Sequence, residues 1–264
     1  MAWLLNRLHA ILIGTLSLIV IALAGPAMPD VPLRVADWEK AWTDVLTRSV
    51  DISGRIDFAS LARDRAGLDL VVAFIALNDP SSRPDMFPDR NARLAYYINA
   101  YNALAMFGVV DEGVPRSLGG LKKVMFFYFR KFDVGVSRIS LYDLENKVIR
   151  PIGEERIHFL LNCMVASCPR LPRVAVSPGD LEGQLEAAAR SFVDDRRNVQ
   201  VDRDRREVRL SAIFKFYTED FTTRAPNLIA YVNRYRTDPI PLDFKIRFLD
   251  YDWTVNARNG TMER

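Results

Sequence analysis

The stretch NARLAYYINAYNALAMFGVV, residues 91–110, is apolar over most of its length. It predicts a helix from Ala92 to Val110. Asp89 or Asn91 is the expected N-cap, because both side chain types accept hydrogen bonds from the free N–H groups that begin a helix. Other helical segments lie on both sides of this one, so we expect a fold that is rich in helices.

Two asparagines, Asn99 and Asn102, stand in the middle of this helix. They are three residues apart and therefore share one face. Asparagine is unfavourable inside a helix and needs a reason to be there. One interpretation is that the two amides face a cleft and bind a ligand. The other is a buried polar network that joins the helix to loop backbone, since buried amides require partners.

Working outward, Val35, Trp38 and Trp42 recur at helical spacing, and a second helix is expected over residues 58–77. A loop with three prolines, residues 79–89, separates that helix from the next. The other expected elements are a strand or hairpin over 126–140, a short helix over 141–149 capped by Ser140, a strand over 156–163, a loop over 164–174, a helix over 177–193, two strands around a charged turn over 199–211, helices over 212–221 and 227–236, and a strand over 244–256.

These elements predict an α+β fold, with a single helix-rich domain around a small, mostly antiparallel sheet. Consecutive βαβ units are not visible, which argues against a doubly wound parallel sheet. We expect the domain to span residues 34–255, followed by a flexible tail over 256–264. The residues expected to be buried are Trp38, Trp42, Phe74, Tyr97, Leu104, Phe107, Phe159, Leu161, Phe214 and Phe221.

The N-terminus has the layout of a secretory signal peptide. Arg7 precedes an uncharged apolar run that ends in the A-x-A pattern of residues 22–24. That run is shorter than the roughly 20 residues that cross a bilayer. We therefore expect a signal peptide over 1–24 and a linker over 25–33, with Ala27 as a second cleavage point, and a periplasmic or secreted protein. The alternative is a protein anchored by an uncleaved N-terminal segment.

The distribution of charge along the chain indicates which classes of partner to expect. Lys plus Arg number 36 and Asp plus Glu number 33, and the two signs are interspersed. A nucleic-acid-binding protein would show a concentrated basic face, so we expect no nucleic acid partner. An envelope substrate or protein partner is expected instead, with membrane contact only through an uncleaved N-terminus. No cofactor is expected.

Five blocks occur in order along the chain: YYINAYNALAMFGVV, ISLYDLENKVIR, RIHFLLNCMVASCPRLP, LSAIFKFYTEDF and YDWTVN. They resemble the signature blocks of the DUF547 family, a domain of unknown function that is common in exported bacterial proteins. The resemblance extends from about residue 74 to residue 256 and implies little biochemistry. Many members carry Glu-His in the second block, whereas this chain has Glu145-Asn146.

The third block, residues 156–172, holds both cysteines of the chain, Cys163 and Cys168, together with His158. In an extended strand His158 and Cys163 would point to opposite faces about 16 Å apart. In a helix they would lie about 140° apart around the axis. The chain must therefore turn within residues 162–169 before these side chains can act together.

Three interpretations of the cysteines stay open. Thiols of an exported protein tend to oxidise, so Cys163 and Cys168 are candidates for a disulfide. In a catalytic site Cys168 would be the nucleophile and His158 its base, because a thiol needs a base or cation beside it to react at neutral pH. In the third interpretation the cysteines are core residues. A zinc site is not expected, because the spacing matches no usual ligand pattern.

A catalytic histidine also needs a group that orients it. The candidates are Glu145, Asn99, Asn102 and the carboxylate pair Glu219-Asp220. Two functions follow. The first is a cysteine-dependent hydrolase or acyl transferase of the cell envelope. The second is a non-catalytic binding or scaffold module of the envelope with a Cys163–Cys168 disulfide. The candidate site residues are His158, Cys168 and Glu145 for catalysis and Asn99, Asn102 and Cys163 for binding.

Overall fold

The computed structural model describes residues 34–258, which lie in the compact unit Leu33–Arg264. The predicted signal peptide, the predicted linker and residues 259–264 of the predicted tail lie outside the described residues. The described part combines helices with two small sheets, so the α+β prediction is confirmed. None of its helices has the length and apolarity needed to cross a membrane.

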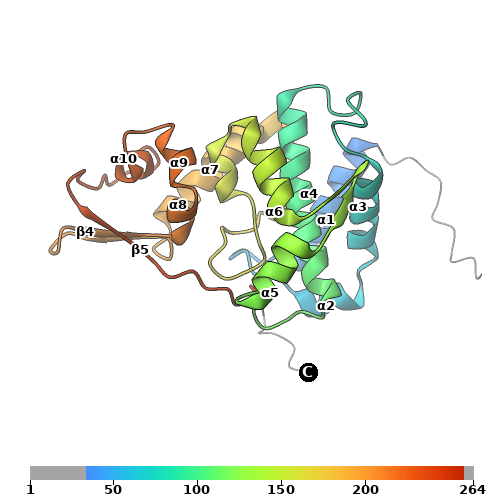
Figure 1. The fold of residues 1–264 in the computed structure, drawn as a ribbon, viewed down its shortest axis with the longest axis horizontal. Coiled ribbons are helices and arrows are strands. Elements are labelled where there is room, and N and C mark those ends of the chain that lie inside the picture. Colours follow the sequence, from blue (N-terminus) through green and yellow to red (C-terminus); the bar gives the residue numbers. More distant parts are fainter. Residues whose placement is uncertain (1–33, 259–264) are drawn as a thin grey trace, which may run out of the picture. The chain divides into compact units, whose positions relative to one another are not determined.

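Helix α4 (Arg90–Asp111) is the central element, and Figure 1 shows it beside α1 and α3. The N-cap is Asp89, whose Oδ1 accepts a hydrogen bond from the backbone N–H of Ala92 at 2.8 Å. Buried residues occur on every side of α4, from Leu94 to Val110. A helix that is apolar all round is a core helix, and the domain is built around this one.

Helix α1 (Val35–Ser49) forms where it was predicted and buries Trp38 and Trp42. The Trp38 ring stacks on Phe74 with centroids 5.1 Å apart, which joins α1 to α3 (Ala66–Leu77). The spacing of the two tryptophans thus sets the face of α1 that packs into the domain.

The single helix predicted over 58–77 is wrong, because the structure has two helices there. Helix α2 (Phe58–Arg63) ends at Arg63, and α3 begins at Ala66. The charged residues between Ala62 and Gly67 bury no apolar side chain that could hold a continuous helix against the core. Helix stability depends mainly on such packing, so the chain turns at this point.

The strand predicted for the first part of 126–140 is also wrong. Helix α5 (Leu121–Val124) continues directly into a π-helical turn, η1 (Met125–Phe129). Phe126 and Phe127 are both buried although they are adjacent. Neighbouring residues of a strand point to opposite faces, so the helical turn is the conformation that buries both rings.

The hairpin itself is present, with β1 (Phe132–Val134) paired antiparallel to β2 (Ser137–Ile139). The predicted cap, Ser140, follows, and its Oγ accepts a hydrogen bond from the N–H of Asp143 at 3.1 Å. The helix predicted over 141–149 is formed by α6 (Leu141–Asp143) and the π-helical η2 (Leu144–Ile149), and a short 3₁₀ turn, η3 (Arg150–Ile152), extends it.

The strand predicted over 156–163 is wrong. The chain forms a 3₁₀ turn, η4 (Glu155–Phe159), and then runs without regular structure. Asn102 of α4 takes the place of a neighbouring strand: its side chain donates to Leu160 O at 2.9 Å and accepts from Asn162 N at 2.7 Å. Buried backbone groups need partners, and here a side chain supplies them.

The C-terminal part carries the second sheet, with strand order β3-β4-β5. The pair β3–β4 is antiparallel as predicted, whereas β4–β5 is parallel. The helix predicted over 212–221 is interrupted at Tyr217. The elements are η5 (Pro178–Asp180), α7 (Leu181–Asp194), β3 (Val199–Asp202), β4 (Glu207–Leu210), α8 (Ala212–Phe216), α9 (Thr218–Thr222), α10 (Leu228–Asn233) and β5 (Lys245–Phe248).

The strand predicted over 244–256 is confirmed only for β5. Further along, isolated bridges pair Val255 with Val165 and Ala257 with Ile56. The backbone N–H of Arg258 also donates to Ile56 O at 2.8 Å. Residues 254–258 therefore return to the first part of the domain.

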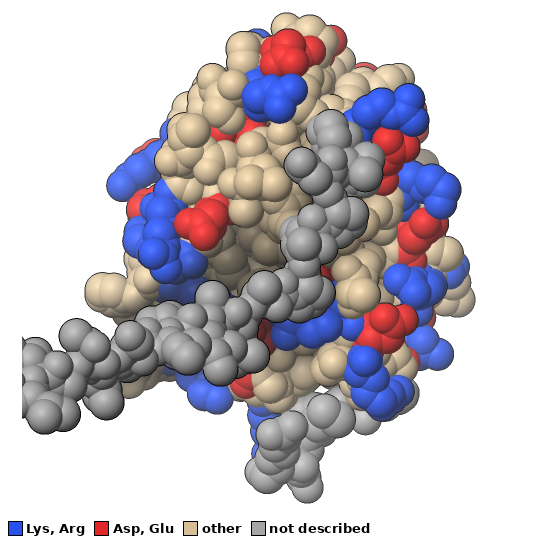
Figure 2. All heavy atoms as spheres, turned by 90° about the vertical axis from the view of Figure 1, so that its right-hand side faces the viewer, with Lys and Arg blue, Asp and Glu red and all other residues tan. Residues whose placement is uncertain are grey.

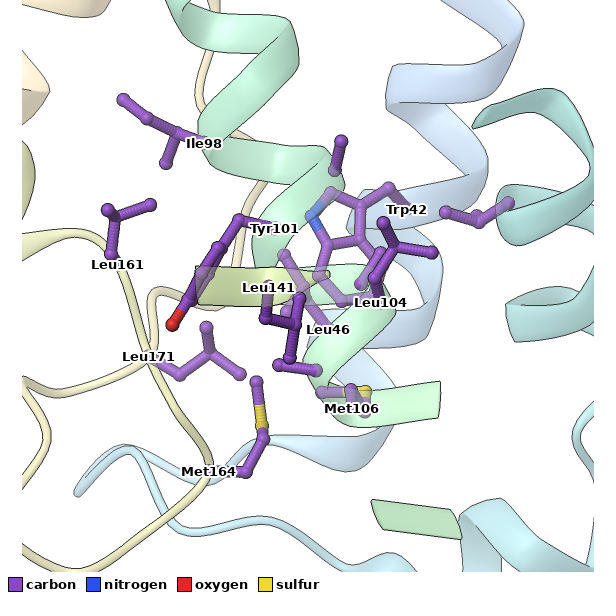
Figure 3. Close-up of a cluster of buried hydrophobic side chains, with 14 of the residues drawn as sticks. Trp42, Leu46, Ile98, Tyr101, Leu104, Met106, Leu141, Leu161, Met164 and Leu171 are labelled. Carbon is purple, nitrogen blue, oxygen red and sulfur yellow. The ribbon is translucent and has the colours of Figure 1, made fainter. Parts of the chain in front are cut away.

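The core has two clusters of buried side chains. Figure 3 shows part of the first, with Trp42 of α1, Leu104 of α4 and Leu171 among its labelled side chains. Of the ten residues expected to be buried, Tyr97 and Phe107 are half-buried and the other eight are buried. Helical spacing thus identified most of the core.

Most charged side chains of the described residues lie at the surface with the two signs mixed, whereas Asp79, Glu145 and Glu155 are buried. Figure 2 shows Lys and Arg beside Asp and Glu around the margin of one face. Ion pairs among the described residues include Lys40–Asp44 at 2.8 Å and Arg156–Glu154 at 2.7 Å. On that face the charges form pairs rather than a concentrated basic patch.

Candidate functional site

A pocket of about 370 Å³ lies between α4, the helical segments 121–129 and 141–152, and the C-terminal part of the chain. Volumes of this size are typical of small-molecule sites. His158, Glu145 and Cys163 line it. Aromatic side chains make most of the remaining wall: Tyr101, Phe127, Tyr128, Tyr142, Phe216, Tyr217, Tyr251 and Trp253.

His158 is held between carboxylates. Its Nε2 lies 2.8 Å from Oδ2 of Asp220, and its Nδ1 lies 4.0 Å from Oε1 of Glu145. Asp220 is the acceptor, so Nε2 carries the proton of the shorter contact. The imidazole is therefore fixed in orientation, with Nδ1 on the side of Glu145.

Arg150 completes this group by binding Asp220 with two nitrogens, Nε at 2.8 Å and Nη2 at 2.7 Å. Partial burial by itself raises the pKa of Asp220. The hydrogen bond from His158 and the bonds from Arg150 outweigh burial and hold that pKa well below its ordinary value of 3.8. Asp220 is therefore ionised at neutral pH, and its carboxylate orients both His158 and Arg150.

Tyr217 covers the imidazole. The interruption between α8 and α9 lies at this residue, and its ring stacks on His158 with centroids 3.7 Å apart. Its hydroxyl donates to Oε1 of Glu145. Burial first, and then the Glu145 carboxylate, raises the pKa of Tyr217 well above its ordinary value of 10.0. Tyr217 therefore remains a neutral donor to Glu145, and both residues line the pocket.

The two cysteines form a disulfide, Cys163–Cys168, with Cα atoms 6.1 Å apart. Cys163 lines the pocket, whereas Cys168 is buried behind it. The hydroxyl of Tyr251 lies 3.2 Å from the Cys163 sulfur and 3.4 Å from the Cys168 sulfur. Of the three interpretations of the cysteines, the structure has the disulfide.

Asn99 and Asn102 do not line the pocket. Asn99 donates from Nδ2 to Val176 O at 2.8 Å, and its Oδ1 accepts from Val176 N at 2.9 Å. Asn102 binds the backbone at residues 160 and 162 in the same two-way manner. The amides form the buried network between helix and loop that was the second interpretation of this pair.

The structure therefore brings together His158, Glu145 and Cys163, with Cys168 bonded behind the wall. Asp220 had been one of several candidates to orient His158 and is the residue that binds it most closely. Arg150, Tyr217 and Tyr251 were not predicted. The only signal for Arg150 was its place at the end of the second block, ISLYDLENKVIR.

No group of three or more His, Cys, Asp and Glu side chains within residues 34–258 is arranged to hold a metal ion. The polar part of the pocket is an ion-pair and hydrogen-bond network, in which Arg150 and the protonated nitrogen of His158 meet the Asp220 carboxylate. The rest of the wall is aromatic. Small-molecule sites in proteins typically combine apolar walls with a few fixed polar groups in this way.

The chain was compared with family models, curated proteins and solved structures. The chain has no significant match among curated proteins or among solved structures. The family model described as "Protein of unknown function, DUF547" matches residues 85–193. This range contains the central helix and the Cys163–Cys168 disulfide. Residues 85–193 of the chain are therefore similar to the DUF547 family.

Proposed function

We propose that this protein is a non-catalytic ligand-binding module of the cell envelope and that the pocket beside His158 is its binding site. The observation that carries the proposal is the Cys163–Cys168 bond. The sulfurs of Cys163 and Cys168 are bonded to each other, so neither is a thiolate. A disulfide of this kind is typical of the oxidising compartments outside the cytoplasm, which supports the expected location.

The walls of the pocket indicate the ligand's chemistry. Aromatic rings on several sides favour a flat or apolar body. Lys123 lines the pocket with its ammonium group 4.7 Å from the centre of the Trp253 ring. Within residues 34–258 it forms no ion pair, whereas Arg150 is already paired with Asp220. We therefore propose a small amphipathic ligand with an anionic group that Lys123 binds.

The alternative is a cysteine-dependent hydrolase or acyl transferase. One observation favours it, because Cys163 and His158 line the same pocket. His158 also has the orienting carboxylate that a catalytic base needs. That function requires the disulfide to be reduced first, since the thiolate is the nucleophile.

The test is a fluorescence titration of the oxidised full chain with 8-anilinonaphthalene-1-sulfonate, an aromatic anion. We expect one saturable site per chain. Lys123→Gln should weaken binding about 10- to 150-fold, because a hydrogen bond to a charged group contributes about 1.5–3 kcal/mol. Lys245→Gln, an exposed lysine on β5, is the matched control and should bind as the unmodified chain does.

Two outcomes would overturn the proposal. The first is equal binding by the Lys123→Gln and Lys245→Gln variants. The second is a burst of nitrophenolate from 4-nitrophenyl acetate that appears after reduction and is lost in His158→Ala. That burst would make the hydrolase the better description of the site.

A further inference from the structure

The helical segment 121–129, formed by α5 and η1, carries an apolar face that the domain leaves uncovered. Leu121 is 76% exposed, Met125 54% and Phe129 65%. These residues recur every four positions and therefore share one side of the helix. Phe126 and Phe127 point the other way and anchor the segment in the core. The segment is thus held firmly while its outer face meets solvent.

Basic residues surround this face. Residues 119–132, GGLKKVMFFYFRKF, contain four basic residues and no acidic one. Arg130 and Lys131 form ion pairs with acidic side chains nearby. Within residues 34–258, Lys122 and Lys123 form none. Lys122 is exposed beside the apolar side chains, whereas the ammonium group of Lys123 lies over Trp253 in the pocket.

We propose that the outer face of residues 121–129 is a docking surface for a membrane that contains anionic lipids. An amphipathic helix with Phe and Leu on one face and Lys or Arg beside it lies in the bilayer interface. Leu121, Met125 and Phe129 would enter the boundary of the acyl chains, and Lys122 would meet the anionic headgroups. A second copy of the chain would place the same lysines against each other, so charge favours the lipid.

The docking surface adjoins the pocket. Lys123, Phe127 and Tyr128 belong to this segment and also line the pocket. The Tyr128 ring stacks on Tyr142 at 4.3 Å. Docking therefore places the mouth of the pocket near the membrane surface, where amphipathic molecules concentrate. This last consequence rests on the proposed binding function, whereas the docking surface does not.

The test is hydrogen–deuterium exchange of the full chain with and without vesicles of phosphatidylcholine and phosphatidylglycerol at 70:30. The readout is local to the peptides that cover residues 119–131, so the N-terminal segment does not enter it. We expect vesicles to slow exchange there at least threefold. High salt should reduce the protection, because it screens charge. Vesicles of pure phosphatidylcholine should protect these peptides less than the anionic vesicles do.

The test variant is Leu121→Glu with Phe129→Glu, and the matched control is Leu77→Glu with Ile52→Glu. The control residues are 74% and 87% exposed and lie outside the surface. The test variant should lose the protection and the control should keep it. Lys122→Gln should lower vesicle affinity about fivefold, compared with no change for Lys245→Gln.

Three results would overturn the docking proposal: no protection with anionic vesicles, equal protection in the two double variants, or protection that appears without vesicles and grows with protein concentration. The last would assign the surface to a second copy of the chain. Both double variants should still bind the aromatic sulfonate in the pocket, so a failure of docking is distinguishable from a failure of the binding function.

Discussion

His158 and Asp220 lie 62 residues apart in the chain, and their side chains meet at 2.8 Å. This contact joins the segment that matches the family model, residues 85–193, to the C-terminal helices, because Asp220 lies on α9. It also connects the imidazole of the pocket to Arg150. The carboxylate is the shared partner of two donors and is therefore important for the stability of the domain.

We predict that Asp220→Asn lowers the free energy of unfolding by about 1–3 kcal/mol, because it leaves His158 and Arg150 without their anion. Urea denaturation measures this change. Glu219→Gln is the matched control, since Glu219 is the adjacent exposed carboxylate. This substitution should lower the free energy of unfolding by less than about 0.5 kcal/mol. Equal losses in the two variants would contradict the contact.

Substitution of Asn102 should lower the free energy of unfolding more than is usual for a polar residue. Asn102→Ala removes the partners of Leu160 O and Asn162 N, both of which are buried. Each unsatisfied buried group costs about 1–3 kcal/mol, so we expect a loss of about 2–5 kcal/mol. Asn91→Ala, an exposed position on the same helix, should change little. A small effect at both positions would show that the loop does not depend on this amide.

Asp195 gives a prediction for acid stability. Burial raises its pKa, but the bonds from Arg197 and Arg170 outweigh burial and lower that pKa from 3.8 to about 2. A lowered pKa stabilises the fold at pH values above 3.8, and this contribution is lost as pH falls toward 2. The contribution is about 2 kcal/mol.

The measurement is the free energy of unfolding of Asp195→Asn between pH 5 and pH 2. The variant should be less stable at pH 5 and should lose less stability than the unmodified chain as the solution is acidified. Asp194→Asn changes the exposed neighbouring carboxylate and should follow the curve of the unmodified chain. Parallel curves for all three proteins would refute a role for Asp195.

Part of this structure follows from local chemistry and was predictable. Asp89 and Ser140 cap helices because their own side chains reach the adjacent N–H groups. The spacing of Trp38 and Trp42 identified a buried helix face. The α+β class followed from the number and order of such segments.

The segment after residue 155 was not predictable in this way. Its apolar residues fit a strand, but Asn102, about 60 residues earlier, binds its backbone. The same holds for the site, where Asp220 and Tyr217 reach His158 from distant helices. Composition and spacing give no distance between segments so far apart, so the orienting carboxylate remained one candidate among several.

The central claim is that the pocket binds a ligand and carries no catalytic thiol. Measuring whether Cys163 and Cys168 are bonded or free tests this claim most directly. The measurement is the intact mass of the oxidised chain after alkylation with iodoacetamide in denaturant, with and without prior reduction. We predict no label without reduction and two labels after it, on Cys163 and Cys168. One or two labels on the unreduced chain, with Cys163 modified, would contradict the disulfide and return the cysteine to consideration as a nucleophile.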